Sequence, residues 1–159
     1  MSMLDGFEIR LADPFSPEAT DLCARLSAEL AAMYPEYSDS GRGAFEPADA
    51  AGPTGAFLIA WMAGRPVGCA ALRPMESGVA EFKRLYVEPG VRRRGVAGRL
   101  IAELEHHARR LGYMSVRLET GARQPGSIRA TESAGYRRIA NYGIYAGNPL
   151  SLCFEKKLS

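Results

Sequence analysis

The segment from Arg92 to Gly98 is the part of the sequence best suited to bind an anion. Three consecutive arginines and two glycines stand here between a predicted strand and the first turn of a predicted amphipathic helix. The first N–H groups of a helix have no partner within it, and the helix dipole adds about half a positive charge there. Gly95 and Gly98 let a phosphate approach the backbone without meeting a Cβ. The segment therefore predicts a diphosphate-binding turn.

The segment does not match the common nucleotide-binding motifs. No Gly-Lys-Ser/Thr follows it, as a P-loop requires, and it contains no GxGxxG dinucleotide motif. The alternative to an anion-binding site is a solvated arginine cluster at the start of a helix. Arginines in that place oppose the helix dipole and destabilise the helix by about 0.3 kcal/mol each, a conflict that a bound anion removes.

The elements that must position this segment alternate between strands and helices. Period-two and helical patterns predict strands over 7–11, 57–62, 67–72, 79–87, 114–120, 136–140 and 150–155, and helices over 17–34, 96–111 and 127–133. The strand, helix, strand succession from 79 to 120 requires a right-handed crossover and parallel pairing of its two strands. The sequence thus predicts one α/β domain with a mixed sheet, spanning 1–159.

Composition excludes several classes of protein. The chain has 159 residues and a formal net charge of +2, which gives no global field for nucleic acid or an anionic membrane. Its most apolar stretch is shorter than the roughly 20 residues of a membrane-spanning helix. The N-terminus lacks the features of a secretory signal, so a cytoplasmic location is expected. Three scattered cysteines and two adjacent histidines predict no metal site.

Several motifs together resemble one family. Arg92-x-x-Gly95-x-Ala97 is similar to the Arg/Gln-x-x-Gly-x-Gly/Ala signature of the GNAT superfamily of N-acetyltransferases. The segment 81–89 looks like the strand that precedes that signature. The segment 63–68 resembles the hairpin between the family's second and third strands, and 132–136 resembles its helix-ending Gly-Phe/Tyr. The resemblance covers most of the chain.

This resemblance implies a fold, a cofactor and a set of contacts. The fold is the GNAT-like acyl-CoA N-acyltransferase fold: a mixed, mostly antiparallel sheet, flanked by helices and splayed between its fourth and fifth strands. Acetyl-CoA would lie in the gap as the acyl donor, with no metal, and a homodimer is expected. The implied cofactor-binding residues are Leu85, Tyr86 and Val87 for the pantetheine arm, Arg92, Arg93, Arg94, Gly95, Val96, Ala97 and Gly98 for the pyrophosphate, and Gln124.

The resemblance also implies catalytic roles. Glu81 matches the catalytic glutamate of related histone acetyltransferases, so it is the predicted general base, acting directly or through water. The alternative is a strand carboxylate paired with Arg84 or Lys83. Thr131 stands where many relatives carry a tyrosine that protonates the CoA thiolate. Water, Tyr136, Tyr142 or Tyr145 could supply the proton instead. Tyr145, in a Gly-flanked segment, is the predicted donor, and the alternative is a tyrosine packed on a rim.

The acceptor is expected to be a primary amine. Tyr34 and Tyr37 occupy a region that lines the acceptor site in relatives. The alternative is that these aromatics, which lie beside a proline, form hydrophobic staples at the end of the helix. Glu36 and Asp39 would attract a cationic amine.

These features predict an enzyme that moves an acetyl group from acetyl-CoA to a small-molecule amine, a protein lysine or an N-terminus, by direct attack in a ternary complex. A non-catalytic acyl-CoA sensor or partner-binding module is the alternative. Nucleic-acid and membrane partners are not expected.

Overall fold

A computed structural model describes residues 6–37 and 45–159. Its strands are β1 (Phe7–Leu11), β2 (Ala56–Met62), β3 (Arg65–Glu76), β4 (Val79–Val87), β5 (Ser115–Gly121), β6 (Arg137–Ile139) and β7 (Ser151–Lys157). Its helices are α1 (Pro17–Met33), α2 (Val96–Arg110) and α3 (Pro125–Ser133), with short 3-10 turns η1 (Pro47–Ala50), η2 (Pro89–Val91) and η3 (Gly143–Tyr145).

All the strands belong to one sheet. Its order is β1-β2-β3-β4-β5-β7-β6, and every neighbouring pair is antiparallel except β4 and β5. The parallel pair flanks α2, as the strand, helix, strand succession requires. The predicted mixed, mostly antiparallel sheet is confirmed.

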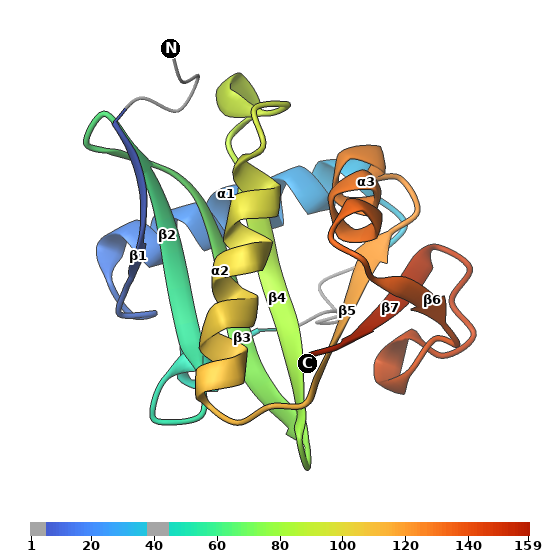
Figure 1. The fold of residues 1–159 in the computed structure, drawn as a ribbon. Coiled ribbons are helices and arrows are strands. Elements are labelled where there is room, and N and C mark those ends of the chain that lie inside the picture. The colour runs from blue at the N-terminus through green and yellow to red at the C-terminus, as the bar shows by residue number, and fades with distance from the viewer. Residues whose placement is uncertain (1–5, 38–44) are drawn as a thin grey trace.

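Each face of the sheet carries its own helices. In Figure 1, α2 crosses the front of the sheet and α1 passes behind it, while α3 lies beside the upper end of β5. One apolar cluster joins α2 to the front face, with Ala80 and Phe82 of β4 at its centre. A second cluster joins Leu22 and Leu26 of α1 to Ala71 on the other face. Side chains alternate along β4, so Glu81 and Lys83 lie on the α1 face.

The sheet opens between β4 and β5. Their pairing runs from Val79↔Ser115 to Phe82↔Leu118 and stops there, although both strands continue. A bulge in β4 accompanies the separation: Arg84 has φ of 58°, and the register with β3 shifts between Cys69↔Tyr86 and Ala71↔Lys83. A bulge bends and twists its strand, which directs β4 away from β5. The expected splay is thus confirmed.

Local sequence signals place the helix starts well. The Ser16 hydroxyl accepts a hydrogen bond from the Ala19 N–H at 3.2 Å, and Pro17 occupies the first turn of α1. α3 begins two residues earlier than predicted, because Pro125 also starts a helix favourably. β6 is shorter than the strand predicted over 136–140, and β3 is longer at both ends than the strand predicted over 67–72.

In the described part of the chain, no helix is both long and apolar enough to cross a membrane.

Candidate active site

Residues 92–98, here called the cradle, join η2 to α2. Gly95 is the N-cap of α2 at φ 83°, and Arg93 also takes a left-handed conformation, with φ of 65°. Alternating backbone conformations of this kind turn successive N–H groups toward one point, which makes an anion-binding concavity. No side chain within the described residues caps α2. The first-turn N–H groups of Val96, Ala97 and Gly98 are therefore open to a ligand.

A cavity of about 710 Å³ lies over the cradle. Leu85, Tyr86 and Val87 of β4 form one wall, and α3 forms the opposite wall. Of the cradle residues, the cavity is lined by Arg92, Arg93, Gly95, Val96, Ala97 and Gly98. The Arg94 side chain is exposed and lies outside this lining. The predicted cofactor residues are thus brought together, with Arg94 at the margin.

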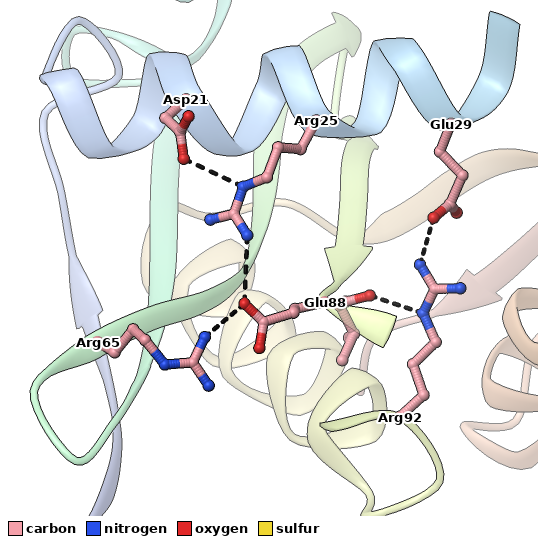
Figure 2. Close-up of polar contacts among 7 residues, drawn as sticks. Asp21, Arg25, Glu29, Arg65, Glu88 and Arg92 are labelled. Atoms are coloured by element: carbon pink, nitrogen blue, oxygen red, sulfur yellow. Dashed lines mark hydrogen bonds and ion pairs between the residues drawn. The ribbon is translucent and has the colours of Figure 1, made fainter. Parts of the chain in front are cut away.

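Arg92 holds the cradle in place with its side chain. Its Nε donates a hydrogen bond to the Val87 carbonyl at 2.7 Å, and its guanidinium pairs with Glu29 of α1 at 2.6 Å. Figure 2 shows the guanidinium turned between α1 and the end of β4. Arg92 therefore fixes the start of the cradle to two elements, in addition to lining the cavity.

A second polar chain runs beside this contact. Asp21 pairs with Arg25 at 3.0 Å, and Arg25 and Arg65 both pair with Glu88 (Figure 2). The hydrogen bond from Arg65 holds the pKa of Glu88 below its ordinary value. The carboxylate thus stays charged and links α1, the β2–β3 turn and the residue before η2. These ties position the cradle relative to the sheet.

A second cavity, of about 460 Å³, lies on the α1 side of the gap and is here called the α1-side cavity. Its walls come from α1, the bulge of β4, β5 and α3. Several residues line both cavities, namely Leu26, Leu85, Ile101, Gln124 and Ser127. The two cavities therefore meet at the middle of the gap, beside Leu85.

Tyr34 and Tyr37 line the α1-side cavity, as predicted for acceptor residues. Their ring centroids are 5.8 Å apart. The Tyr34 hydroxyl accepts a hydrogen bond from the Arg123 N–H at 3.0 Å, and the Tyr37 hydroxyl donates to Asn148 Oδ1 at 2.9 Å. Tyr34 thus ties the end of α1 to the loop before α3, and Tyr37 ties the segment that follows α1 to the segment after η3.

Gln124 stands at the junction of the two cavities. Its Oε1 accepts a hydrogen bond from the Gly121 N–H at 3.0 Å and another from the Tyr34 hydroxyl at 3.4 Å. Glu36, predicted to attract an amine, pairs instead with Arg123, whose hydrogen bond lowers the pKa of Glu36 to about 2. Asp39 lies outside the described residues.

Gly121 leaves the space that Tyr34 occupies. A Cβ built on Gly121 would overlap the Tyr34 hydroxyl, and Tyr34 is only 4% exposed. Gly121→Ala is therefore expected to displace Tyr34 and to lower the free energy of unfolding by about 1–3 kcal/mol. Gly126→Ala is the matched control, because nothing lies within 4 Å of its Cβ position. Urea unfolding checks both, and equal stabilities for the two variants would contradict this packing.

Glu81 is buried on the α1 face of β4, with 4% of its surface exposed. Its Oε1 pairs with Arg73 at 2.9 Å, and its Oε2 accepts a hydrogen bond from the Tyr142 hydroxyl at 2.8 Å. Arg73 also pairs with Asp49 of η1 at 2.9 Å. The partner of Glu81 is thus Arg73, and the alternative of a pair with Lys83 or Arg84 is wrong. Glu81 does not line either cavity, and its role as a base stays a prediction.

Tyr145 is buried, with 2% of its surface exposed. Its ring lies against the ring of Tyr142, the tyrosine that donates a hydrogen bond to Glu81. The Tyr145 hydroxyl accepts a hydrogen bond from Lys83 Nζ at 2.8 Å. Burial raises the pKa of Tyr142, and the charge of Glu81 adds to this effect. Tyr142 therefore stays protonated as a donor to Glu81. Tyr145 lies behind Lys83 rather than on the cavity wall.

The similarity of this chain to known proteins shows which family it belongs to. Residues 23–136 match the family model described as "Acetyltransferase (GNAT) family". The chain belongs to the GNAT acetyltransferase family. It is therefore an enzyme of the acetyl-CoA-dependent acyltransferase class.

Relatives of this GNAT acetyltransferase agree with that assignment. It is 32% identical over 146 residues to the "IAA acetyltransferase" of Azospirillum brasilense, a match that covers 91% of this chain and 94% of the relative. A solved structure from Klebsiella pneumoniae, assigned as an acyl-CoA N-acyltransferase, has a TM-score of 0.78 and 30% identity and covers 96% of this chain and 98% of its own. A GNAT acetyltransferase from Elizabethkingia anophelis with acetyl-CoA bound shares the fold, with a TM-score of 0.68, 18% identity and coverage of 97% and 99%.

Thr131 of this GNAT acetyltransferase is completely buried and lines the α1-side cavity. Its Oγ1 has no hydrogen-bond partner within the described residues. A buried hydroxyl without a partner is destabilising by about 1–3 kcal/mol, which a ligand in the cavity would offset. Thr131 therefore lines this cavity with an unsatisfied polar atom.

Three charged residues at the site have no binding or catalytic role predicted from the sequence: Arg73, Lys83 and Glu119. Lys83 and Glu119 line the α1-side cavity, and Arg73 holds Glu81. A signal for two of them was present. In 79–87 and 114–120, charged residues alternate with apolar ones, and this pattern predicts a polar face on both strands where they flank the gap.

Proposed function

We propose that this protein transfers the acetyl group of acetyl-CoA to a primary amine held in the α1-side cavity, by direct attack in a ternary complex. The observation that carries this proposal is the meeting of the two cavities beside Leu85. A diphosphate on the cradle and a pantetheine arm along β4 would bring the thioester to that junction. The acceptor would approach it from the α1 side.

The reaction needs one proton removed and one delivered. The amine nitrogen attacks the carbonyl carbon of the thioester, a C–N bond forms, the C–S bond breaks, and the thiolate takes up a proton. For a lysine-like amine of pKa about 10.4, deprotonation at pH 7 costs about 4.6 kcal/mol. A carboxylate beside the amine would lower that barrier.

Two carboxylates on the α1 face are candidates for the proton acceptor. Glu119 lines the α1-side cavity, whereas Glu81 lines neither of the two cavities. We therefore propose Glu119 as the group nearest to the amine. Glu81, which lines neither cavity, would act through water, one of the two routes predicted from the sequence. The role of Tyr145 as proton donor to the thiolate likewise stays a prediction.

Glu119→Gln is expected to lower kcat about 100-fold at pH 7, because the neutral amide cannot take a proton. Glu81→Gln serves as the comparison, since it removes the other carboxylate of the same face. Thiol release from acetyl-CoA with an amine acceptor measures both. A larger loss of kcat in Glu81→Gln than in Glu119→Gln would contradict the proposal that Glu119 takes the proton. It would favour Glu81 as the base.

The transfer itself is tested by mixing the protein with acetyl-CoA and a panel of amines, followed by measurement of free thiol and of the acetylated product. Release of thiol matched by product formation is the expected result. Binding of acetyl-CoA without thiol release for any amine would overturn the proposal and favour an acyl-CoA sensor. The cytoplasmic location, the homodimer and the single-domain span of 1–159 stay predictions.

A further inference from the structure

Lys83 is a buried cation in the wall of the α1-side cavity. It is 9% exposed, and it comes from the bulged part of β4 where the sheet opens. Its ammonium has three donors, and the structure gives it one hydrogen bond, to the Tyr145 hydroxyl at 2.8 Å. Over residues 6–37 and 45–159, no carboxylate forms an ion pair with Lys83.

Two of the neighbouring charges are engaged elsewhere, while Glu119 lines the same cavity and its charge acts on Lys83. Glu81 pairs with Arg73, and the Arg84 guanidinium donates hydrogen bonds to the Cys23 carbonyl and the Ser27 hydroxyl, both at 2.6 Å. Burial lowers the pKa of Lys83 below its ordinary value. A buried ammonium without a paired anion is unfavourable, so an anionic group entering the cavity would gain a charge-assisted contact.

We propose that Lys83 binds a carboxylate of the acceptor, so that the acceptor is an amino acid or a similar small amine that carries a carboxylate. This inference rests on the proposed acetyl transfer and names the substrate class for it. The amine of such a molecule would face Glu119, which lines the same cavity. A phosphate fits less well, because Glu46 and Glu119 in the wall repel a dianion more strongly than a carboxylate.

The size and walls of the cavity define the rest of the acceptor. The cavity has a volume of about 460 Å³ and must also admit the thioester end of acetyl-CoA. Tyr34, Tyr37 and Phe45 form an aromatic wall on the side of α1. An apolar or aromatic side chain would pack there. The class is thus a free amino acid with an apolar or aromatic side chain.

The test compares each apolar and aromatic amino acid with its own carboxamide, using thiol release to measure kcat/KM. The amino group of a carboxamide is the weaker base and is more fully neutral at pH 7, so simple amine reactivity favours the amide. With the wild-type protein, the best amino acid is expected to exceed its amide at least about 10-fold, as a charge-assisted contact predicts. Lys83→Met is expected to remove this preference, mainly by raising KM for the acid, and Lys83→Arg is expected to retain most of it.

The remaining outcomes separate this inference from the proposed function. Equal or better use of the amides by the wild type, or acetylation of neutral polyamines alone, would overturn the carboxylate site and leave acetyl transfer standing. An equal loss of kcat for acid and amide in Lys83→Met would also overturn it, since that pattern indicates a proton-transfer role. Thermal unfolding and CoA titration of Lys83→Met confirm that the variant is folded. No turnover with any amine would instead refute the proposed function itself.

Discussion

Gly95→Asp is expected to weaken the binding of CoA about 100-fold, measured by titration calorimetry, because its carboxylate would stand beside the N–H groups that hold the diphosphate. Gly95 caps α2 at φ 83°, and nothing lies within 4 Å of a Cβ built there. An aspartate therefore fits sterically. Two like charges about 4 Å apart repel by up to about 4 kcal/mol near a protein surface, and solvent reduces this to the expected loss.

Gly95→Asn is the matched control for that variant. Asparagine has nearly the shape of aspartate and also tolerates left-handed backbone, so it carries the same conformational cost without the charge. Its affinity for CoA is expected to fall less than about 10-fold, since strain at a left-handed non-glycine residue is about 1 kcal/mol. If Asp and Asn weaken CoA binding equally, the cradle does not hold the diphosphate.

Arg73→Met is expected to lower the free energy of unfolding by about 3–5 kcal/mol, because it leaves Glu81 buried without its ionic partner. Glu81 is 5% exposed at its side chain, and Arg73 contacts it at 2.9 Å. The same change releases Asp49 of η1, which is itself partly exposed. Denaturant unfolding followed by circular dichroism measures the loss.

The double variant Arg73→Met with Glu81→Gln separates a buried charge from lost packing. Replacing both partners removes the uncompensated carboxylate, and the Tyr142 hydroxyl can still donate to the side-chain carbonyl of the introduced glutamine. We expect the double variant to regain more than half of the lost stability. If the double variant is as unstable as Arg73→Met alone, the packing of the Arg73 side chain causes the loss, and the ion pair adds little.

The cradle was predictable because its signals are local. A strand, a Pro-Gly turn, an arginine run with Gly95, and an amphipathic helix follow one another within 79–111, and each has its own sequence signature. The parallel pairing of β4 with β5 followed from the crossover rule. Helix starts at Pro17 and Pro125 lie within two residues of prediction because proline fixes the first turn.

The polar partners across the sheet were not predictable from local signals. Glu81 meets Arg73 because the β3–β4 register places them opposite each other, and that register changes at the bulge around Arg84. Sequence spacing favoured Lys83 or Arg84, which are close to Glu81 in the chain but extend elsewhere. A bulge depends on the packing of neighbouring strands, so its position and its effect on Lys83 appear only in the folded chain.

The role of Arg92 also depended on tertiary structure. Its place in the arginine run predicts a phosphate contact, yet its side chain is bonded to Glu29 and the Val87 carbonyl. Glu29 lies 63 residues earlier in the chain, and only the packing of α1 against the end of β4 brings the two together. Long-range ion pairs of this kind have no signature in the sequence.

A calorimetric comparison of CoA with pantetheine, which shares the thiol arm of CoA but lacks the diphosphate and the adenosine 3′-phosphate joined to it, tests the cradle most directly. Charge-assisted hydrogen bonds contribute about 1.5–3 kcal/mol each, so two or more cradle N–H contacts predict at least about 100-fold tighter binding of CoA. That difference is the expected result. Equal affinities for the two compounds, or no binding of CoA at all, would contradict a diphosphate site at the N-terminus of α2.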